Sequence, residues 1–171
     1  MSGVKKRRGK SAKTFGQFVA VPSSLRALLE QIGQLAEQNG MAAYAVGGCV
    51  RDWLLGRDRT TDLDVVVEGD GIAFARQLSQ VLNVPVTVHE QFGTATLMAN
   101  TSHSNVATTP RARRRATSSS EISTSIRLDL ATCRKERYAE PAAYPRVSKG
   151  TLRDDLFRRD FTINAMAVSL E

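Results

Sequence analysis

The sequence lacks the features of disulfide-stabilised, membrane-spanning and cysteine-ligated metal proteins. It has only two cysteines in 171 residues, Cys49 and Cys133, and they form no metal-ligand spacing. Such sparse cysteines indicate reduced intracellular thiols rather than a disulfide framework. No apolar run approaches the ~20 residues that a transmembrane helix needs. We therefore expect no membrane partner.

The N-terminus also lacks the apolar region of a secretory signal peptide. Its first 13 residues, MSGVKKRRGKSAK, hold six lysines and arginines and no acid. This composition is compatible with an organelle transit peptide, a nuclear signal or an RNA-binding arm. Because nothing in the sequence argues positively against it, we expect a cytoplasmic protein.

The positive charge of the chain, a formal +7, is concentrated in two segments without hydrophobic periodicity. The first lies in an expected disordered basic arm over residues 1–20. The second, residues 99–125, has a net charge of +3, and the remainder of the chain outside it and residues 1–13 has a net charge of −2. Such segments can bind phosphate backbones through counterion release, or they simply keep a protein in solution.

Residues 100–125 interrupt the pattern of the domain. This stretch, NTSHSNVATTPRARRRATSSSEISTS, is rich in Ser, Thr and Arg and nearly without large apolar side chains. It cannot bury enough surface to offset its ordering entropy, and loops of this length are uncommon inside compact domains. We expect a disordered insertion at the tip of a β-hairpin, or an artefact of gene prediction.

The remaining pattern predicts one domain over residues 21–171, whose core is supported by an apolar content of 42% for the whole chain. The first predicted helix is capped by Ser23 or Ser24 and ends at Gly40, and the second runs from Val50 to Gly56. Two further helices are predicted over residues 72–82 and over residues 152–157, the latter capped by Thr151. Their expected apolar faces include Leu54, Leu55 and Val81. Predicted strands are Ala42–Val46, Leu63–Val67, Val84–His89, Thr94–Met98 and Ile126–Leu130. The apolar run Phe161–Leu170 has no clear period.

Asp62 and Asp64 begin a predicted strand and are two residues apart. Residues at this spacing point to the same face of a sheet, so their oxygens can converge on one hard divalent cation. Mg²⁺ prefers a few carboxylates together with substrate phosphates and water, and a second metal can activate an attacking hydroxyl. The alternative is a strand start with two exposed acids, which is the commoner meaning of an isolated pair.

The residues before this pair suit a phosphate. Gly47 and Gly48 precede a short helix that has Arg51 in its first turn. Glycines let backbone N–H groups approach a phosphate, a helix N-terminus favours negative charge, and arginine adds a fork of donors. A glycine pair alone usually marks a turn, but its combination with an arginine and two aspartates is much rarer.

Two further clusters could complete such a site. Asp129 lies on the alternating strand IRLDLAT, either on an exposed polar face with Arg127 or beside the aspartate pair on a neighbouring strand. Arg158, Arg159 and Asp160 follow the last predicted helix. They form either a solvated helix end or a group in which Arg159 reaches a triphosphate while Asp160 orients its neighbours.

Two longer stretches carry a resemblance to a known family. GGCVRDWLLGRDRTTDLDVVVEG resembles the first signature of the tRNA nucleotidyltransferase (CCA-adding enzyme) and bacterial poly(A) polymerase family, and RRDFTINAMA resembles its second. Between them, LDLATCRKERY followed by PAAYPRV is similar to the strand and loop that join the signatures. The resemblance covers about residues 42–171 apart from the insertion.

The resemblance implies a head domain of the DNA-polymerase-β-like nucleotidyltransferase fold, an α+β fold with a small mixed sheet and packed helices. It implies that Asp62 and Asp64 bind Mg²⁺, with Asp129 as the third carboxylate, near the primer hydroxyl. It assigns the phosphates of the incoming nucleotide to Gly47, Gly48, Arg51 and Arg159. The resemblance also matches Arg134 and Glu136, which would place a loop over the site. Asp52 matches a family position or else packs or caps its helix, and Asp160 would orient neighbouring groups.

The implied function is Mg²⁺-dependent addition of CMP or AMP, from CTP or ATP, to an RNA 3′ end, with tRNA as the expected RNA. Poly(A) addition is the main alternative. Members of the family continue into helical neck, body and tail domains that contain the base-reading residues, and these domains are absent from the 171 residues. A truncated RNA- or nucleotide-binding fragment without catalysis is therefore a third reading, and a separate chain could supply the missing domains.

Overall fold

The computed structural model describes residues 19, 21–57, 60–102, 123–137, 140 and 146–171. Nearly all of the arm predicted for residues 1–20 and most of the insertion predicted for residues 100–125 lie outside the described residues. The six terminal residues of that predicted insertion, 100–102 and 123–125, are strand instead, because the ladder between two neighbouring strands continues through them. A β-hairpin therefore flanks the insertion, as predicted.

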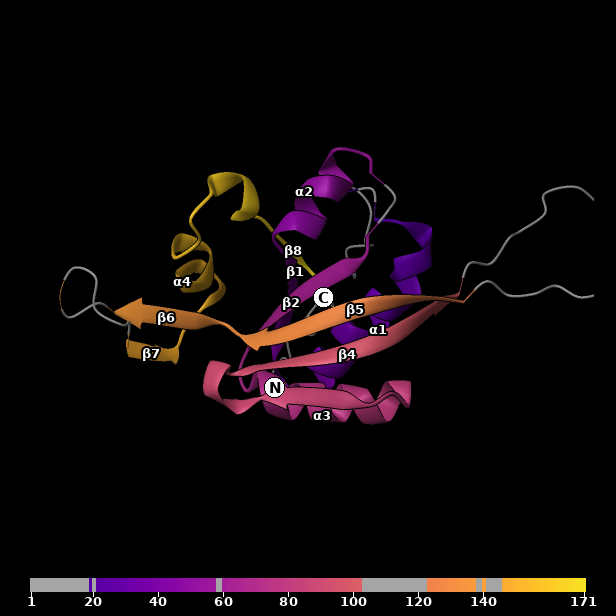
Figure 1. Cartoon of the computed structure of the whole chain (residues 1–171), viewed down its shortest axis with the longest axis horizontal. Coiled ribbons are helices and arrows are strands. Elements are labelled where there is room, and N and C mark those ends of the chain that lie inside the picture. The colour runs from indigo at the N-terminus through magenta and orange to yellow at the C-terminus, as the bar shows by residue number, and fades with distance from the viewer. Residues whose placement is uncertain (1–18, 20, 58–59, 103–122, 138–139, 141–145) are drawn as a thin grey trace, which may run out of the picture.

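The described chain folds into a mixed six-stranded sheet packed against helices (Figure 1), which confirms the predicted α+β class. Its strand order is β3-β4-β5-β2-β1-β8. The strands are β1 (Ala42–Val46), β2 (Asp62–Glu68), β3 (Val86–His89), β4 (Thr94–Ser102), β5 (Ser123–Thr132) and β8 (Ala167–Ser169). Strands β2 and β5 run parallel, and the other neighbours in this sheet are antiparallel.

One face of the sheet forms the main core. Helices α1 (Ser23–Gln38) and α3 (Gly71–Leu82) pack against alternate residues of the strands, with α3 along the lower edge in Figure 1 and α1 behind. In β2, Leu63, Val65 and Val67 point into this core. Because side chains alternate along a strand, Asp62 and Asp64 point to the opposite face. That second face is covered only in part, where Val66 packs in a small cluster with Leu152 of the last helix.

The helix boundaries show where local pattern and packing disagree. The predicted serine caps of α1 are wrong: Pro22 occupies the cap position and no side chain caps the helix. Helix α2 (Gly48–Leu54) buries Val50 and Trp53, but the predicted face is too wide, since Leu54 and Leu55 are more than half exposed. Val81 of α3 is likewise exposed. Strand β3 begins two residues later than predicted.

The chain after β5 forms a small second sheet that the sequence pattern did not predict. Strands β6 (Arg134–Arg137) and β7 (Arg146–Lys149) form a separate two-stranded sheet beside helix α4 (Leu152–Phe157). Helix α4 begins with Thr151 as its cap, as predicted. The apolar run that followed without a clear period contains a 3₁₀ turn, η3 (Thr162–Asn164), and the edge strand β8.

Within the described residues, no helix is long and apolar enough to cross a membrane. The cytoplasmic location stays a prediction.

Candidate active site

A cleft of about 360 Å³ opens on the partly covered face of the sheet. Strands β2, β4 and β5 form its floor, and the end of α4 forms one wall. Its polar lining consists of Asp64, His89, Thr94, Thr96, Arg127, Asp129, Arg158 and Arg159. A second cavity of about 190 Å³ adjoins it around α2 and shares Asp64. Six of the predicted site residues line one or both of these adjoining cavities: Gly48, Arg51, Asp62, Asp64, Asp129 and Arg159.

The three predicted carboxylates lie on one face of the parallel pair of strands, β2 and β5. Asp64 lies directly opposite Asp129 in the register between β2 and β5, and Asp62 lies opposite Arg127. Directly opposed residues share a face, so all three acids point away from the main core. Of the two arrangements that the sequence left open, Asp129 lies beside the aspartate pair, and it also shares that polar face with Arg127.

Asp129 is already engaged by neighbouring side chains. The Thr96 hydroxyl donates a hydrogen bond to its Oδ1 at 2.6 Å. The Arg127 guanidinium pairs with it at 3.0 Å between Nε and Oδ2. A cation at this face would compete with Arg127 for the carboxylate. Thr96 is a site residue that sequence reasoning missed, because only the β4–β5 register brings it to Asp129.

The pKa of the Asp64 carboxyl is raised by its surroundings. Desolvation in the cleft raises the pKa of its carboxyl, and the negative charges of Asp129 and Asp62 raise it further. The positive charges of Arg159 and Arg127 oppose this shift. Carboxylates with perturbed pKa values in a cleft are typical of functional sites. Clustered like charges destabilise the folded protein, so they are retained mainly where a site needs them.

This donor set fits a hard divalent cation. Carboxylate oxygens on neighbouring strands are the ligands that Mg²⁺ prefers, with room in the cleft for phosphates and water. Within the described ranges, no three acidic, histidine or cysteine side chains yet stand close enough together to enclose a metal ion. Asp129 instead contacts Arg127 and Thr96, and Asp62 accepts a 3.0 Å hydrogen bond from the Thr61 hydroxyl.

Gly47 forms the junction between the carboxylates and the arginines. Its φ of +79° is one that L-residues rarely adopt. A Cβ at this position would lie 3.1 Å from Nη1 of Arg159 and 3.7 Å from Oδ2 of Asp64. The absence of a side chain therefore lets the Arg159 guanidinium lie close to the Gly47 backbone, beside the Asp64 carboxylate.

Arg51 lies on the other side of the glycine pair, and the two signatures meet at its side chain. Its Nη1 donates a hydrogen bond to Oδ1 of Asn164 in η3 at 2.8 Å, and its Nε pairs with Asp52 at 3.0 Å. Hydrogen bonding by Arg51 lowers the pKa of the Asp52 carboxyl. Gly48 is the first residue of α2, beside the Arg51 guanidinium. Asn164 was missed because its motif offered no reason to pair it with Arg51.

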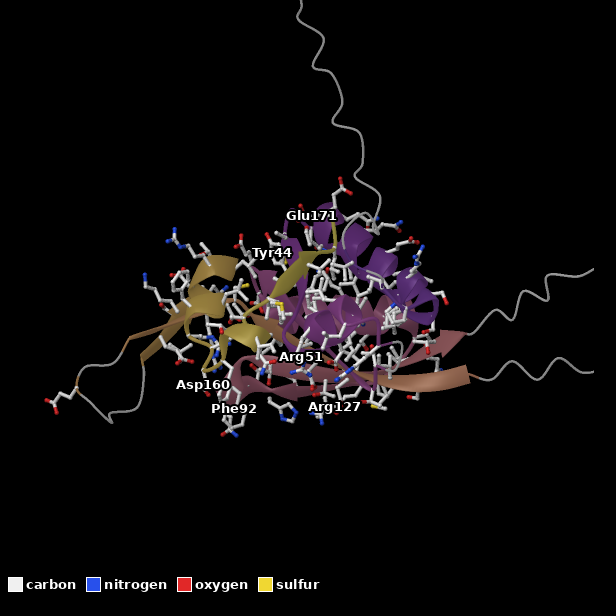
Figure 2. All side chains as sticks on the ribbon, turned by 90° about the horizontal axis from the view of Figure 1, so that it is seen from above. Tyr44, Arg51, Phe92, Arg127, Asp160 and Glu171 are labelled. Carbon is white, nitrogen blue, oxygen red and sulfur yellow. The ribbon has the colours of Figure 1, made fainter. Side chains whose placement is uncertain are left out.

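The other predicted residues, from the second signature and from the stretch between the signatures, separate into those that line the cleft and those that do not. Arg159 lines the cleft, and its Nη2 pairs at 3.1 Å with the buried Asp155. Arg134 and Glu136 do not line the cleft but pair with each other at 3.1 Å behind it. Asp160 is exposed and makes no hydrogen bond or ion pair with other residues that the structure describes. In Figure 2 Asp160 lies on the same side of the molecule as Arg51 and Arg127, opposite Glu171.

Both cysteines are buried free thiols. Burial raises the pKa of Cys49 to about 11 and that of Cys133 to about 12, so both stay protonated at neutral pH. The Cys49 thiol donates a hydrogen bond to the Val46 carbonyl at 3.2 Å. Neither is a nucleophile, since the thiolate is the reactive form.

Comparisons of the sequence with known proteins match most of the chain, including the residues of the candidate site. Residues 43–171 match the Poly A polymerase head domain family. An A-adding tRNA nucleotidyltransferase of Geobacter sulfurreducens is 36% identical over 150 residues, covering 88% of this chain and 14% of the relative. A CC-adding tRNA nucleotidyltransferase of Deinococcus radiodurans is 37% identical over 125 residues, covering 73% and 27%.

Solved structures of similar proteins superpose on most of this chain. The apo form II structure of a CCA-adding enzyme superposes with a TM-score of 0.68 at 33% identity, over 89% of this chain and 30% of that one. A tRNA nucleotidyltransferase complexed with a primer tRNA and an incoming ATP analog gives 0.55 at 36% identity, over 82% and 31%. The chain thus spans about a third or less of the length of these proteins.

Proposed function

The chain belongs to the Poly A polymerase head domain family, and from this premise we propose that it transfers a nucleoside monophosphate from CTP or ATP to the 3′ end of tRNA. Its fold is the DNA-polymerase-β-like nucleotidyltransferase fold, as predicted. The choice of tRNA as acceptor is supported by the names of the relatives, which add A, CC or CCA to tRNA.

One observation carries the proposal: Asp64 faces Asp129 across two parallel strands, with Asp62 on the same face and Arg159 across the cleft. Asp62, Asp64 and Asp129 would hold Mg²⁺, which when bound stabilises the charge of the transferred phosphoryl group and the leaving pyrophosphate. Asp129 would also position the primer hydroxyl. Gly47, Gly48, Arg51 and Arg159 would bind the triphosphate, so catalysis combines positioning with electrostatic stabilisation.

The test is incorporation of labelled CTP or ATP into tRNA that lacks its 3′ CCA, with Mg²⁺ present. The wild-type chain should extend the tRNA, and Asp64→Ala should reduce the rate by at least about a thousandfold, since the metal contacts act mainly in the transition state. Chelation by EDTA should stop the reaction. Full activity of Asp64→Ala would remove the metal site from the proposal.

Poly(A) addition is the second candidate, because the matching family is described by that activity. The two readings differ in product length and in acceptor. A tRNA nucleotidyltransferase stops after one to three additions and needs a tRNA acceptor, whereas a poly(A) polymerase extends an unstructured RNA with ATP alone. Long products on an unstructured RNA would favour the second candidate.

A third candidate is a nucleotide-binding domain that transfers a nucleotide only together with further domains, since the match covers 14% of one relative and 30% of one solved structure. Such domains, in the same polypeptide or in another, would supply the remaining contacts to tRNA. Binding of ATP with Mg²⁺ but no incorporation into any RNA would support this reading.

A further inference from the structure

Asp155 is a carboxylate with 0% exposure in the middle of α4. Burying an ionised carboxylate is costly unless it is paired and hydrogen-bonded, so such a group is almost never retained without a reason. Its sequence position, in the first turn of a predicted helix, indicates nothing more than a helix-end acid. Its contacts in the structure connect it to the cleft.

Both oxygens of Asp155 accept hydrogen bonds from two consecutive arginines, and Oδ1 also accepts one at 3.5 Å from the backbone N–H of Arg134. Oδ1 accepts hydrogen bonds from Nη2 and Nε of Arg158 at 2.7 and 3.0 Å. Oδ2 accepts from Nη2 of Arg159 at 3.1 Å. The arginines sit three and four residues along the chain, so one buried acid fixes two guanidinium groups at the end of α4. Charge-assisted contacts of this kind hold a side chain in one orientation.

The arginines around Asp155 outnumber the acids. Glu136, whose side chain is 11% exposed, pairs with Arg134 at 3.1 Å and with Arg158 at 3.5 Å. Among the ion pairs of the described residues, Arg158 contacts two acids, whereas Arg134 and Arg159 each contact one acid that they share with Arg158. These three arginines and two acids carry a net charge of +1, and of the two arginines with a single ion pair only Arg159 lines the cleft.

Arg159 keeps a donor that is available to a ligand. Its Nη2 is engaged by Asp155, and its Nε is buried without a hydrogen-bond partner, as is Nε of Arg134. Its Nη1 makes no hydrogen bond with other residues that the structure describes and lies 3.1 Å from the position that a Cβ on Gly47 would take. Because Arg159 lines the cleft, its Nη1 can donate to a phosphate oxygen bound there.

We propose that Asp155 is a positioning residue, which holds Arg159 beside Gly47 and Asp64 so that its guanidinium meets the phosphates of the nucleoside triphosphate. This inference rests on the proposed function, since it concerns the same site. Asp155 itself does not line the cleft. It acts only through the arginine.

A purely structural role for Asp155 makes a different prediction. If the carboxylate only stabilises α4, its loss should lower the amount or thermal stability of the folded protein and leave the nucleotide KM unchanged. If it positions Arg159, its loss should raise the KM for nucleotide in the protein that remains folded. Asp154 is the matched control, because it caps the same helix and lies outside the cleft.

The experiment compares Asp155→Asn with Asp154→Asn in the full chain, measuring KM and kcat for ATP and CTP with a tRNA acceptor. We expect Asp155→Asn to raise KM by about tenfold or more, since small displacements of a positioned group cost one to two orders of magnitude. Asp154→Asn should lower the melting temperature through the lost cap and keep the wild-type KM. An unchanged KM in folded Asp155→Asn overturns the inference.

Two further variants connect the effect to Arg159. In an Arg159→Ala background, Asp155→Asn should add little to KM, because a residue that acts through another has no effect once that other is gone. A full additional tenfold rise would overturn the inference. If Asp155→Asn alone does not fold, Asp155→Glu keeps the charge while displacing it. It should raise KM by less than the loss of Arg159 does, and a wild-type KM overturns the inference.

Failure of the proposed function is distinguishable from failure of this inference. If the wild-type chain transfers nothing, equilibrium binding of ATP with Mg²⁺ replaces KM as the measurement. Weaker binding by Asp155→Asn, with wild-type binding by Asp154→Asn, then supports the positioning role although the transfer reaction fails. Equal binding by both variants and the wild type overturns it, and so does a wild-type chain that binds no nucleotide.

Discussion

At the scale of single residues, the ionised form of Asp64 opposes folding. Its pKa is raised in the folded protein by desolvation and by the charges of Asp129 and Asp62. The folded state therefore binds this proton more tightly than the unfolded chain, and stability falls as pH rises through the interval between the two pKa values. Above that interval the ionised carboxylate lowers the free energy of unfolding by its full electrostatic amount, as is usual for a site that brings like charges together.

Asp64→Asn should consequently stabilise the protein while removing its activity. At pH 7 without divalent cations, we expect its melting temperature to rise by roughly 2 °C, a small value because solvent screens a carboxylate at the cleft. The difference should shrink as the pH falls into the range where Asp64 is protonated. Asp160→Asn, which neutralises an exposed acid, is the control and should melt with the wild type. A lower melting temperature for Asp64→Asn would contradict the electrostatic argument.

Gly47 and Gly40 allow backbone strain to be separated from a local effect on the site. Both have positive φ values, +79° and +64°, but a Cβ on Gly40 meets nothing within 4 Å, whereas one on Gly47 meets Arg159. Each alanine variant should lose about 1 kcal/mol of stability or more from its backbone conformation. Only Gly47→Ala should also weaken binding of ATP, by about tenfold, because it displaces the guanidinium. Thermal melting and calorimetric titration of both variants test this, and equal ATP affinities would contradict it.

At the scale of elements, helix α4 carries Asp155 and leads directly into Arg158 and Arg159, although it has only six residues. So short a helix is not stable by propensity and depends on its ends and its packing. Thr151 and Asp154 form a capping box: the Asp154 N–H donates to the Thr151 side chain at 3.3 Å, and the Asp154 carboxylate accepts from the Thr151 N–H at 3.0 Å.

Removing this cap should loosen α4 without disturbing the central sheet. Thr151→Ala should cost about 1 kcal/mol, whereas Thr151→Ser keeps the hydroxyl and should cost little. Amide hydrogen exchange should show faster exchange in α4 of Thr151→Ala and unchanged exchange in β2 and β5, since local opening differs between elements. Equal protection of α4 in both variants would show that packing alone holds the helix.

Elements were predictable where the signal is local. The alternation around Asp129 and the β-branched run after Asp64 gave the two central strands, and Thr151 gave the start of α4. Burial depends on what packs against an element, so the exposure of Leu54 could not be found from its periodicity. The β6–β7 sheet was missed because its strands alternate only weakly and contain several charges.

The candidate site was predictable in composition and only partly in arrangement. The spacing of Asp62 and Asp64 determines their common face, but the facing of Asp64 and Asp129 depends on a strand register that no local pattern encodes. For that reason the third carboxylate came from the family resemblance rather than from spacing. Asp155, Thr96 and Asn164 were missed for the same reason, since each acts through a partner distant in sequence or hidden by burial.

At the scale of the whole molecule, the main core and the candidate site lie on opposite faces of one sheet. The face toward α1 and α3 is apolar and buried, so it can supply most of the stability. The other face keeps its charges near water, where carboxylates and guanidinium groups remain available to a ligand. This division lets the domain tolerate electrostatic repulsion in the cleft.

The chemistry of that open face predicts how the chain binds nucleotides. In the described part of the chain, the two cavities are lined by carboxylates, arginines, one histidine, threonines, glycine, a buried cysteine and apolar residues, and no Asn or Gln side chain lines either one. Asp155, Asn164 and Asp129 hold the guanidinium groups of Arg159, Arg51 and Arg127, respectively. The guanidinium of Arg159 lies beside Gly47. Such a lining recognises phosphates and a cation, whereas discrimination between bases needs fixed donors and acceptors for the base edge.

We therefore expect the chain to bind ATP, CTP, GTP and UTP in the presence of Mg²⁺ with affinities within about threefold of one another. Inorganic tripolyphosphate should compete with all four, because it supplies the same oxyanions, and adenosine or cytidine at the same concentration should not compete. Calorimetric titrations of the full chain measure each of these affinities. A preference of more than about tenfold for one nucleotide, or competition by a nucleoside, would mean that this domain reads the base itself.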